Sequence, residues 1–129
     1  MGNTIGNLLR KTPGKIFNRQ GGIYQIPCKD CDQIYIGETG KDLQTRIKQH
    51  QQDFKSHKEN NANFIHWLEN GHTIDWNAAA MLKQCNQSSK RKVLEAAKIV
   101  SSNTYNLNKN PFNLQPSTAN ILKKIYRIN

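Results

Sequence analysis

The chain has 129 residues, which is the size of one domain. Lysine and arginine number 19 against 9 acidic residues, so the formal net charge is +10 and a polyanion such as nucleic acid is the expected partner. No apolar run approaches the roughly 20 residues of a membrane span, and three cysteines, an odd number, argue against a disulfide framework.

The first part of the chain predicts an arm followed by a hairpin. Residues 1–20 mix glycine, proline and basic residues, which is typical of a linker or N-terminal arm. Two apolar-rich segments follow at 22–27 and 33–37, and the polar turn at 28–32 separates them. This pattern predicts a β-hairpin.

The rest of the chain alternates between helical and extended patterns. The predicted elements are, in chain order, a helix at 43–58, a short helix at 62–69, a strand within 73–82, a helix at 90–100 and a last short helix at 120–128. Pro111 and Pro116 are expected to break regular structure. The domain is therefore predicted to span 21–115, with a C-terminal tail or short helix at 116–129.

Two triplets that contain the same residue types lie on the predicted hairpin, Gly22-Ile23-Tyr24 on the first strand and Tyr35-Ile36-Gly37 on the second. Aromatic residues on adjacent strands usually belong to the core, which is the alternative interpretation of both tyrosines. The following helix presents Arg46 and His50 four residues apart, on one face. A phenol, a guanidinium and an imidazole can converge beside a small sheet, and phosphodiester cleavage needs such groups.

These motifs together resemble the GIY-YIG nuclease superfamily, which includes homing endonucleases, some restriction enzymes and excision-repair nucleases. Both triplets match letter for letter, and Arg46 follows at the expected distance. The resemblance implies the GIY-YIG nuclease fold, an α+β fold with a small three-stranded antiparallel sheet flanked by helices. It also implies metal-dependent DNA cleavage and a metal-binding glutamate on a later helix, which Glu95 matches; alone, Glu95 would be an ordinary exposed helix residue. The asparagine that the family carries after this helix is Asn106 or Asn108, with a slight preference for Asn108.

Cys28 and Cys31 lie between the triplets, and His66 and His72 follow downstream. Two thiolates and two imidazoles suit a closed tetrahedral zinc site. Such a site has no open position for water, so the zinc is expected to be structural and to tie the hairpin turn to a helix end. The alternative is a free cysteine pair in a turn with two surface histidines. Cys85 lacks a partner and is expected to be an inert thiol.

The cysteine and histidine arrangement is similar to the endonuclease domain of Penelope-like retroelements, which resembles a GIY-YIG nuclease with two added cysteines and histidines. Ile26-Pro27-Cys28, residues 35–40 and residues 69–76 carry this resemblance, which covers about residues 20–110. It implies nicking of target DNA to prime integration, with a reverse transcriptase domain and element RNA as partners in a longer polypeptide. Residues 3–20 look like the connector that follows the reverse transcriptase.

The resemblance implies roles for the site residues. We expect Glu95 and waters to bind one Mg2+ or Mn2+ ion that polarises the scissile phosphate. Tyr24 is expected to accept or relay the proton of the attacking water, and Tyr35 to position the water or the phosphate. Arg46 is expected to neutralise phosphate charge, and His50 to assist the leaving oxygen. Candidates for DNA backbone contacts are Lys41, Lys48, Lys90, Arg91 and Lys92.

The sequence thus predicts a metal-dependent DNA endonuclease, and two alternatives stay open beside a small structural zinc protein in which Tyr24 and Tyr35 are merely core residues. The first is a non-catalytic, zinc-stabilised nucleic-acid-binding domain, which would have no need of Glu95 or of a downstream asparagine. The second is a DNA repair or junction-resolving nuclease, although such relatives usually add a RING-like zinc module and the only cysteine after Cys31 is Cys85. A nuclear location is expected, or a cytosolic one for a prokaryotic or free-standing protein.

Overall fold

The computed structural model describes residues 21–128, and the arm predicted at 1–20 lies outside the described residues. Three strands form one antiparallel sheet in the order β2-β1-β3: β1 (Gly22–Pro27), β2 (Ile34–Thr39) and β3 (Ala80–Gln84). β1 and β2 make the predicted hairpin, in a register that sets Tyr24 opposite Gly37. The predicted α+β fold with a small three-stranded antiparallel sheet is therefore confirmed.

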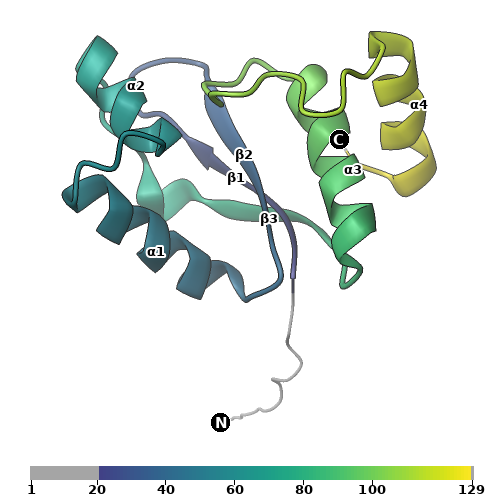
Figure 1. The fold of residues 1–129 in the computed structure, drawn as a ribbon, viewed down its shortest axis with the longest axis horizontal. Coiled ribbons are helices and arrows are strands. Elements are labelled where there is room, and N and C mark those ends of the chain that lie inside the picture. The colour runs from purple at the N-terminus through teal and green to yellow at the C-terminus, as the bar shows by residue number, and fades with distance from the viewer. Residues whose placement is uncertain (1–20, 129) are drawn as a thin grey trace, which may run out of the picture.

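Helices lie on both sides of this sheet (Figure 1). Within residues 21–128 they are α1 (Leu43–Lys55), α2 (Ala62–Asn70), α3 (Ser88–Val100) and α4 (Pro116–Tyr126), and a 3₁₀ turn, η1 (Trp76–Ala78), precedes β3. Figure 1 shows α1 and α2 on one side of the sheet and α3 on the other, with α4 packed against the outer side of α3. The sheet therefore lies between the two helical layers, with β2 at its edge, and the predicted catalytic residues gather beside β2.

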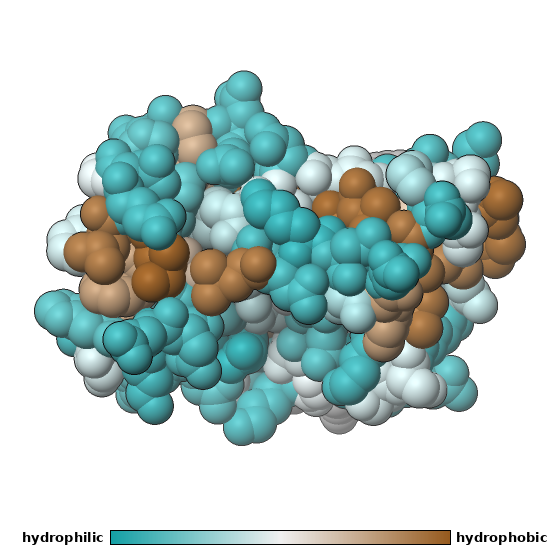
Figure 2. Space-filling view, turned by 45° about the horizontal axis from the view of Figure 1, so that its top comes forward, coloured by the Kyte–Doolittle hydropathy of each residue, from teal (hydrophilic) through white to brown (hydrophobic). Residues whose placement is uncertain are grey.

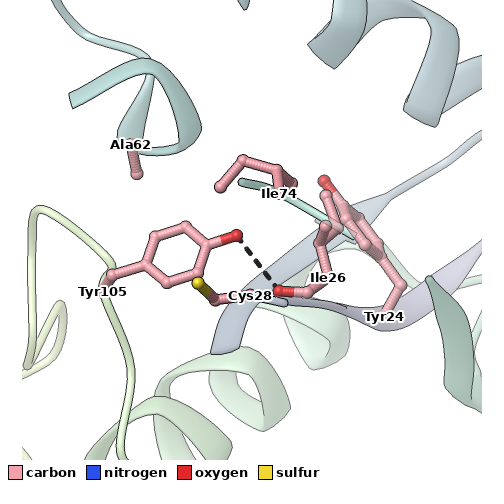
Figure 3. Close-up of a cluster of buried hydrophobic side chains, with 6 residues drawn as sticks. All are labelled: Tyr24, Ile26, Cys28, Ala62, Ile74 and Tyr105. Atoms are coloured by element: carbon pink, nitrogen blue, oxygen red, sulfur yellow. Dashed lines mark hydrogen bonds between the residues drawn. The ribbon is translucent and has the colours of Figure 1, made fainter. Parts of the chain in front are cut away.

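The side chains of β1 alternate between two apolar clusters, because successive residues of a strand point to opposite faces. The cluster on the α1 and α2 side consists of Tyr24, Ile26, Cys28, Ala62, Ile74 and Tyr105 (Figure 3). The cluster on the α3 side consists of Ile23, Ile36, Leu94, Ile99 and Ile128. Ile23 and Tyr24 are both fully buried. The ring of Tyr24 therefore belongs to the core, independently of any role of its hydroxyl.

Several element boundaries differ from those that the sequence predicts. β3 begins late in the strand predicted within 73–82, because η1 turns the chain first. α1 ends at Lys55 instead of Lys58, and α2 ends at Asn70 instead of Glu69, followed by the cap residue Gly71, whose positive φ of 71° suits a glycine. α4 begins at Pro116, which the sequence pattern indicates as a break. Proline is favoured in the first helical turn because its missing N–H would have no partner there.

α4 is only partly covered by the rest of the protein. It buries Ala119 against α3 and leaves Ile121 and Ile125 more than half exposed, at 56% and 63%. Figure 2 shows this apolar surface at the end of the molecule that α4 forms, whereas most of the visible face is hydrophilic. None of the helices within residues 21–128 is long and apolar enough to cross a membrane.

Candidate active site and metal centre

The two signature triplets fit together through one close contact between neighbouring strands. Gly37 lies opposite Tyr24 in the sheet, and the tyrosine ring lies directly over the glycine. A Cβ atom at Gly37 would collide with the ring and hydroxyl of Tyr24. The glycine of the second triplet therefore allows the tyrosine of the first to reach across β2 toward α1.

The hydroxyl of Tyr24 meets the two polar residues that α1 presents. His50 Nε2 lies 2.7 Å from the hydroxyl oxygen, and Arg46 Nε donates to the same oxygen at 3.2 Å. The apolar residues of α1 pack against the first core cluster, and this packing sets the side chains of Arg46 and His50 beside the sheet. The predicted convergence of phenol, guanidinium and imidazole is present in this geometry.

His50 is buried and has a protein partner on each ring nitrogen. Its Nε2 faces Tyr24, and its Nδ1 lies 3.3 Å from the side-chain nitrogen of Asn63 on α2. Burial, together with the positive charge of Arg46, lowers the pKa of His50 to about 4. The ring is therefore neutral at pH 7, and its protonated form is disfavoured by the same two causes.

A cavity of about 340 Å³ opens beside these groups. The predicted site residues that line it are Tyr35, Arg46, His50, Glu95, Asn106 and Asn108, and Asp53 adds a further carboxylate. Tyr24 has no exposed surface, so its hydroxyl lies behind the cavity wall that Arg46 and His50 help to form. Tyr35 is the tyrosine that reaches the cavity. Burial, and then the negative charge of Glu95, raises the pKa of Tyr35.

Glu95 reaches the cavity from α3, whereas Arg46 reaches it from α1. Burial, and then the negative charge of Glu38, raises the pKa of Glu95 to about 7. The ionised carboxylate is thus destabilised by its surroundings, and a bound cation would relieve that cost. One carboxylate in an open cavity also fits Mg2+ or Mn2+, which retain several waters as ligands.

Glu38 holds α3 against the end of β2. Its carboxylate accepts a hydrogen bond of 2.9 Å from Arg91 Nε, and Lys92 Nζ lies 3.5 Å away. Arg91 also donates to the carbonyl oxygen of Cys85. The guanidinium of Arg91, a predicted DNA contact, is therefore turned inward and occupied by these partners.

The other predicted DNA contacts are placed differently. Lys41 and Lys48 are exposed, and the side chain of Lys92 is 52% exposed. The ammonium of Lys90 lies 4.5 Å from the centre of the Tyr126 ring, which is a cation–π contact with α4.

The two candidate asparagines occupy different environments. Asn106 is buried and pairs with the backbone of Ile36, accepting from its N–H at 2.9 Å and donating to its carbonyl oxygen at 2.7 Å. It thereby closes the open edge of β2 beside Tyr35. Asn108 is exposed and accepts a hydrogen bond from the backbone N–H of Asn110. Both line the cavity, but only Asn106 is fixed by the sheet.

Cys28, Cys31, His66 and His72 are positioned to bind a metal ion, as the sequence predicts. Their ligand atoms all lie within 4.8 Å of one another. His66 Nε2 is 3.4 Å from Cys28 Sγ and 3.3 Å from His72 Nδ1, which identifies the nitrogens that face the centre. Two sulfur and two nitrogen donors in a compact cluster fit tetrahedral Zn2+.

Backbone contacts assemble this metal centre from two parts of the chain. Lys29 N donates to the carbonyl oxygen of Thr73 at 2.9 Å, and Thr73 N donates to Asp30 Oδ2 at 2.7 Å. Cys28 and Ile74 form an isolated antiparallel bridge. The hairpin turn is thereby joined to the segment that follows α2, as expected for a structural site.

Sequence reasoning did not single out Asn63 or Tyr105, although both contact functional groups. Asn63 is fully buried and lies beside His50, while Tyr105 stacks on His66 with 4.3 Å between ring centres. One signal was available for Asn63. It precedes His66 by three residues, so the two share a helix face, and a polar residue on that face requires a buried partner.

Comparison with known protein families agrees with this geometry. The family model described as the GIY-YIG catalytic domain matches residues 20–109. The match includes both triplets, Arg46 and Glu95, and it ends before α4. No curated protein and no solved structure matches the chain.

Proposed function

The chain belongs to the GIY-YIG catalytic domain family, and from this premise we propose that it is a metal-dependent DNA endonuclease that hydrolyses phosphodiester bonds. The observation that carries the proposal is the cavity at the edge of β2, which Arg46, Tyr35 and Glu95 line together. A cation, a carboxylate and a phenol at one cavity are the groups that cleavage of a phosphodiester requires.

Glu95 is the residue that would hold the catalytic Mg2+ or Mn2+, with waters completing the coordination shell. When bound, the ion polarises the scissile phosphate and lowers the pKa of the attacking water. Arg46 also lies at the cavity, and its permanent charge neutralises the additional negative charge that the phosphate acquires during attack.

Tyr35 is the phenol that reaches the cavity, and there it orients the attacking water. The water gives its proton to solvent, the resulting hydroxide attacks phosphorus, the bond to the leaving oxygen breaks, and solvent water returns a proton to that oxygen. The fully buried Tyr24 supports this arrangement through its contacts with His50 at 2.7 Å and with Arg46 at 3.2 Å.

This scheme changes the role expected for His50. The sequence comparison suggested that His50 assists the leaving oxygen, but both of its ring nitrogens have protein partners. We therefore propose that His50 holds the hydroxyl of Tyr24 in place. Asn106 is proposed to keep β2, and with it Tyr35, in place, while Asn108 contributes to the cavity rim.

DNA is the proposed substrate because the chain carries a formal charge of +10. The exposed lysines Lys41, Lys48 and Lys92 are proposed to contact the sugar-phosphate backbone. Lys90 is proposed as a weaker contact because Tyr126 already covers its ammonium. Arg91 is proposed to act indirectly by fixing Glu38.

The zinc centre supports a narrower proposal. Its four ligands match the cysteine and histidine pattern by which the sequence resembles the endonuclease of Penelope-like retroelements. We propose that the domain nicks target DNA for retroelement integration, in the nucleus and together with a reverse transcriptase domain and element RNA.

The test of the nuclease assignment is relaxation of a supercoiled plasmid in the presence of Mg2+, Mn2+ or EDTA. Wild-type protein is expected to nick with either metal and not with EDTA, and Arg46→Ala and Glu95→Ala are expected to lower the rate by about 10² to 10³. Glu59→Ala is the matched control, because Glu59 is an exposed carboxylate after α1. Equal nicking by all four proteins would disprove the assignment. DNA retention in EDTA without nicking under any metal would instead establish a non-catalytic binding domain.

A further inference from the structure

The segment between α3 and α4 carries two exposed apolar side chains beside the active-site cavity. Leu107 is 53% exposed and Phe112 is 48% exposed, although both side chains are large and apolar. Leu107 lines the cavity that Arg46 and Glu95 also line. Pro111, the neighbour of Phe112 in the chain, lines it too. Both apolar side chains therefore belong to, or directly follow, the lining of the proposed phosphate site.

Leu107 also lines a second cavity, of about 280 Å³. Asn106 is likewise shared by the two cavities, and His66 of the metal centre is among the residues that line the second. The second cavity also has polar side chains in its lining, among them Gln33, Asn70 and Lys109. A DNA strand that has a phosphate in the first cavity and continues into the second would therefore contact Leu107.

Hydrogen bonds within the loop 110–114 hold Phe112 at its middle. The side chain of Asn110 accepts from Leu114 N at 2.7 Å and donates to the Leu114 carbonyl oxygen at 3.0 Å. Asn113 N donates to the carbonyl oxygen of Asn110 at 3.1 Å. Figure 1 shows the whole segment running from α3 out to β2 and back to α4. The loop is closed by its own polar contacts, so its shape does not require the burial of Phe112.

A nucleobase is the partner that fits this position. Each phosphate of a DNA strand has a nucleoside on either side, so a strand bound for cleavage brings bases close to the cavity. The phosphates are matched by Arg46 and by the formal charge of +10, whereas an apolar side chain finds its contact on the face of a base. In paired DNA that face is covered by the next base pair. Uncovering it costs free energy, and the cost is lowest for a base that is already unpaired.

We propose that Leu107 and Phe112 pack against the faces of unpaired nucleobases next to the scissile phosphate, so that the domain selects DNA whose bases are unpaired at the cleavage site. This inference rests on the proposed nuclease function and deepens it by naming the form of DNA that the cavity takes. Every base has a face of this kind, so contacts of aromatic and apolar side chains with base faces tolerate any sequence. The selection is therefore for DNA structure and not for base sequence.

Binding measured in EDTA tests this contact without cleavage. The probes are a fluorescent oligonucleotide duplex with a short central bubble of unpaired bases and a fully paired duplex of the same length. The wild type is expected to bind the bubble about tenfold more tightly than the paired duplex. Phe112→Ala and Leu107→Ala are each expected to weaken bubble binding about fivefold or more, and to leave duplex binding within about twofold. Both probes carry the same number of phosphates, so the ratio of their Kd values cancels most of the lysine contribution.

Matched variants separate this contact from general apolar or folding effects. Phe112→Trp keeps an aromatic face and is expected to retain the preference for the bubble. Leu68→Ala and Ile125→Ala are the controls, because they remove apolar side chains that are 58% and 63% exposed on α2 and α4. Zinc content verifies that each variant is folded. Equal binding of both probes by the wild type would overturn the inference, and so would alanine variants whose losses are absent or equal on the two probes.

Nicking of the same two probes in Mg2+ separates this inference from the nuclease proposal. A wild type that prefers the bubble through Phe112, but nicks neither probe, would refute the nuclease proposal and leave the base contact intact. A wild type that nicks, while Phe112→Ala and Leu107→Ala keep its full preference for the bubble, would refute the base contact alone.

Discussion

Replacing Glu95 by glutamine is expected to stabilise the metal-free protein at about pH 8, because it removes a carboxylate that the cavity disfavours. The pKa of Glu95 is raised from 4.5 to about 7, so the contribution of its neutral form is complete below pH 4.5 and is lost as the pH rises through 7. Each pKa unit corresponds to about 1.4 kcal/mol, which sets an upper limit of about 3.4 kcal/mol. Because water in the cavity screens part of this energy, we expect about 1–2 kcal/mol, or an increase in Tm of about 5–10 °C.

Thermal unfolding of the wild type and of Glu95→Gln in EDTA, at pH 8 and at pH 4.5, measures this effect. The lowered pKa of His50, about 4, acts with the opposite sign, since it removes stability as the pH falls from 6.5 through 4, but it is common to both proteins and cancels in the difference. Added Mg2+ should stabilise the wild type alone and reduce the gap. Glu59→Gln is the exposed control. A gap of the same size at both pH values, or no gap at pH 8, would refute the reasoning.

Three further predictions concern the framework of the site. Elemental analysis should find one zinc per chain. Cys31→Ser should lower the free energy of unfolding by more than about 3 kcal/mol, since structural zinc binding contributes about 10 kcal/mol or more. Equal melting temperatures with and without a chelator would contradict a structural zinc site. Gly37→Ala should cost about 1–3 kcal/mol in denaturant unfolding, because the new methyl group collides with Tyr24, and an unchanged midpoint would argue against that contact. Asn106→Leu should lower the free energy of unfolding by about 2–3 kcal/mol, because it leaves the Ile36 backbone unpaired. Asn108→Ala should change that free energy by no more than about 0.5 kcal/mol. A larger loss for Asn108→Ala than for Asn106→Leu would exclude Asn106 as the residue that closes the sheet edge.

The sheet and the helices on its faces could be predicted because they depend on local patterns. Apolar-rich segments on either side of a polar turn indicated β1 and β2, and helical patterns indicated α1 and α3. The late start of β3 could not be foreseen, because its pairing with β1 depends on the irregular register near Ile23 and Tyr24. Pro116 was interpreted as a break, yet it begins α4, since only the surrounding fold determines whether a proline lies before a helix or within one.

The site residues that sequence comparison identified are those that the family motifs carry. Arg46 and His50 lie together as their spacing suggested, because one helix presents both, and Glu95, which the family resemblance supplied, lines the same cavity from α3. The partners of these groups depend on long-range packing. Asn63 meets His50 from another helix, and the choice between the two asparagines depends on which one reaches the open edge of β2. No local pattern encodes either contact.

The central claim is that a cation bound at Glu95 makes this cavity a nuclease site. The most direct test compares the rates at which wild type and Glu95→Gln nick supercoiled plasmid in Mg2+, with EDTA as the blank. The account predicts nicking by the wild type in Mg2+ alone, and a rate lower by about 10² or more in the isosteric glutamine variant. Nicking that persists in EDTA, or that proceeds equally fast in Glu95→Gln, would contradict it.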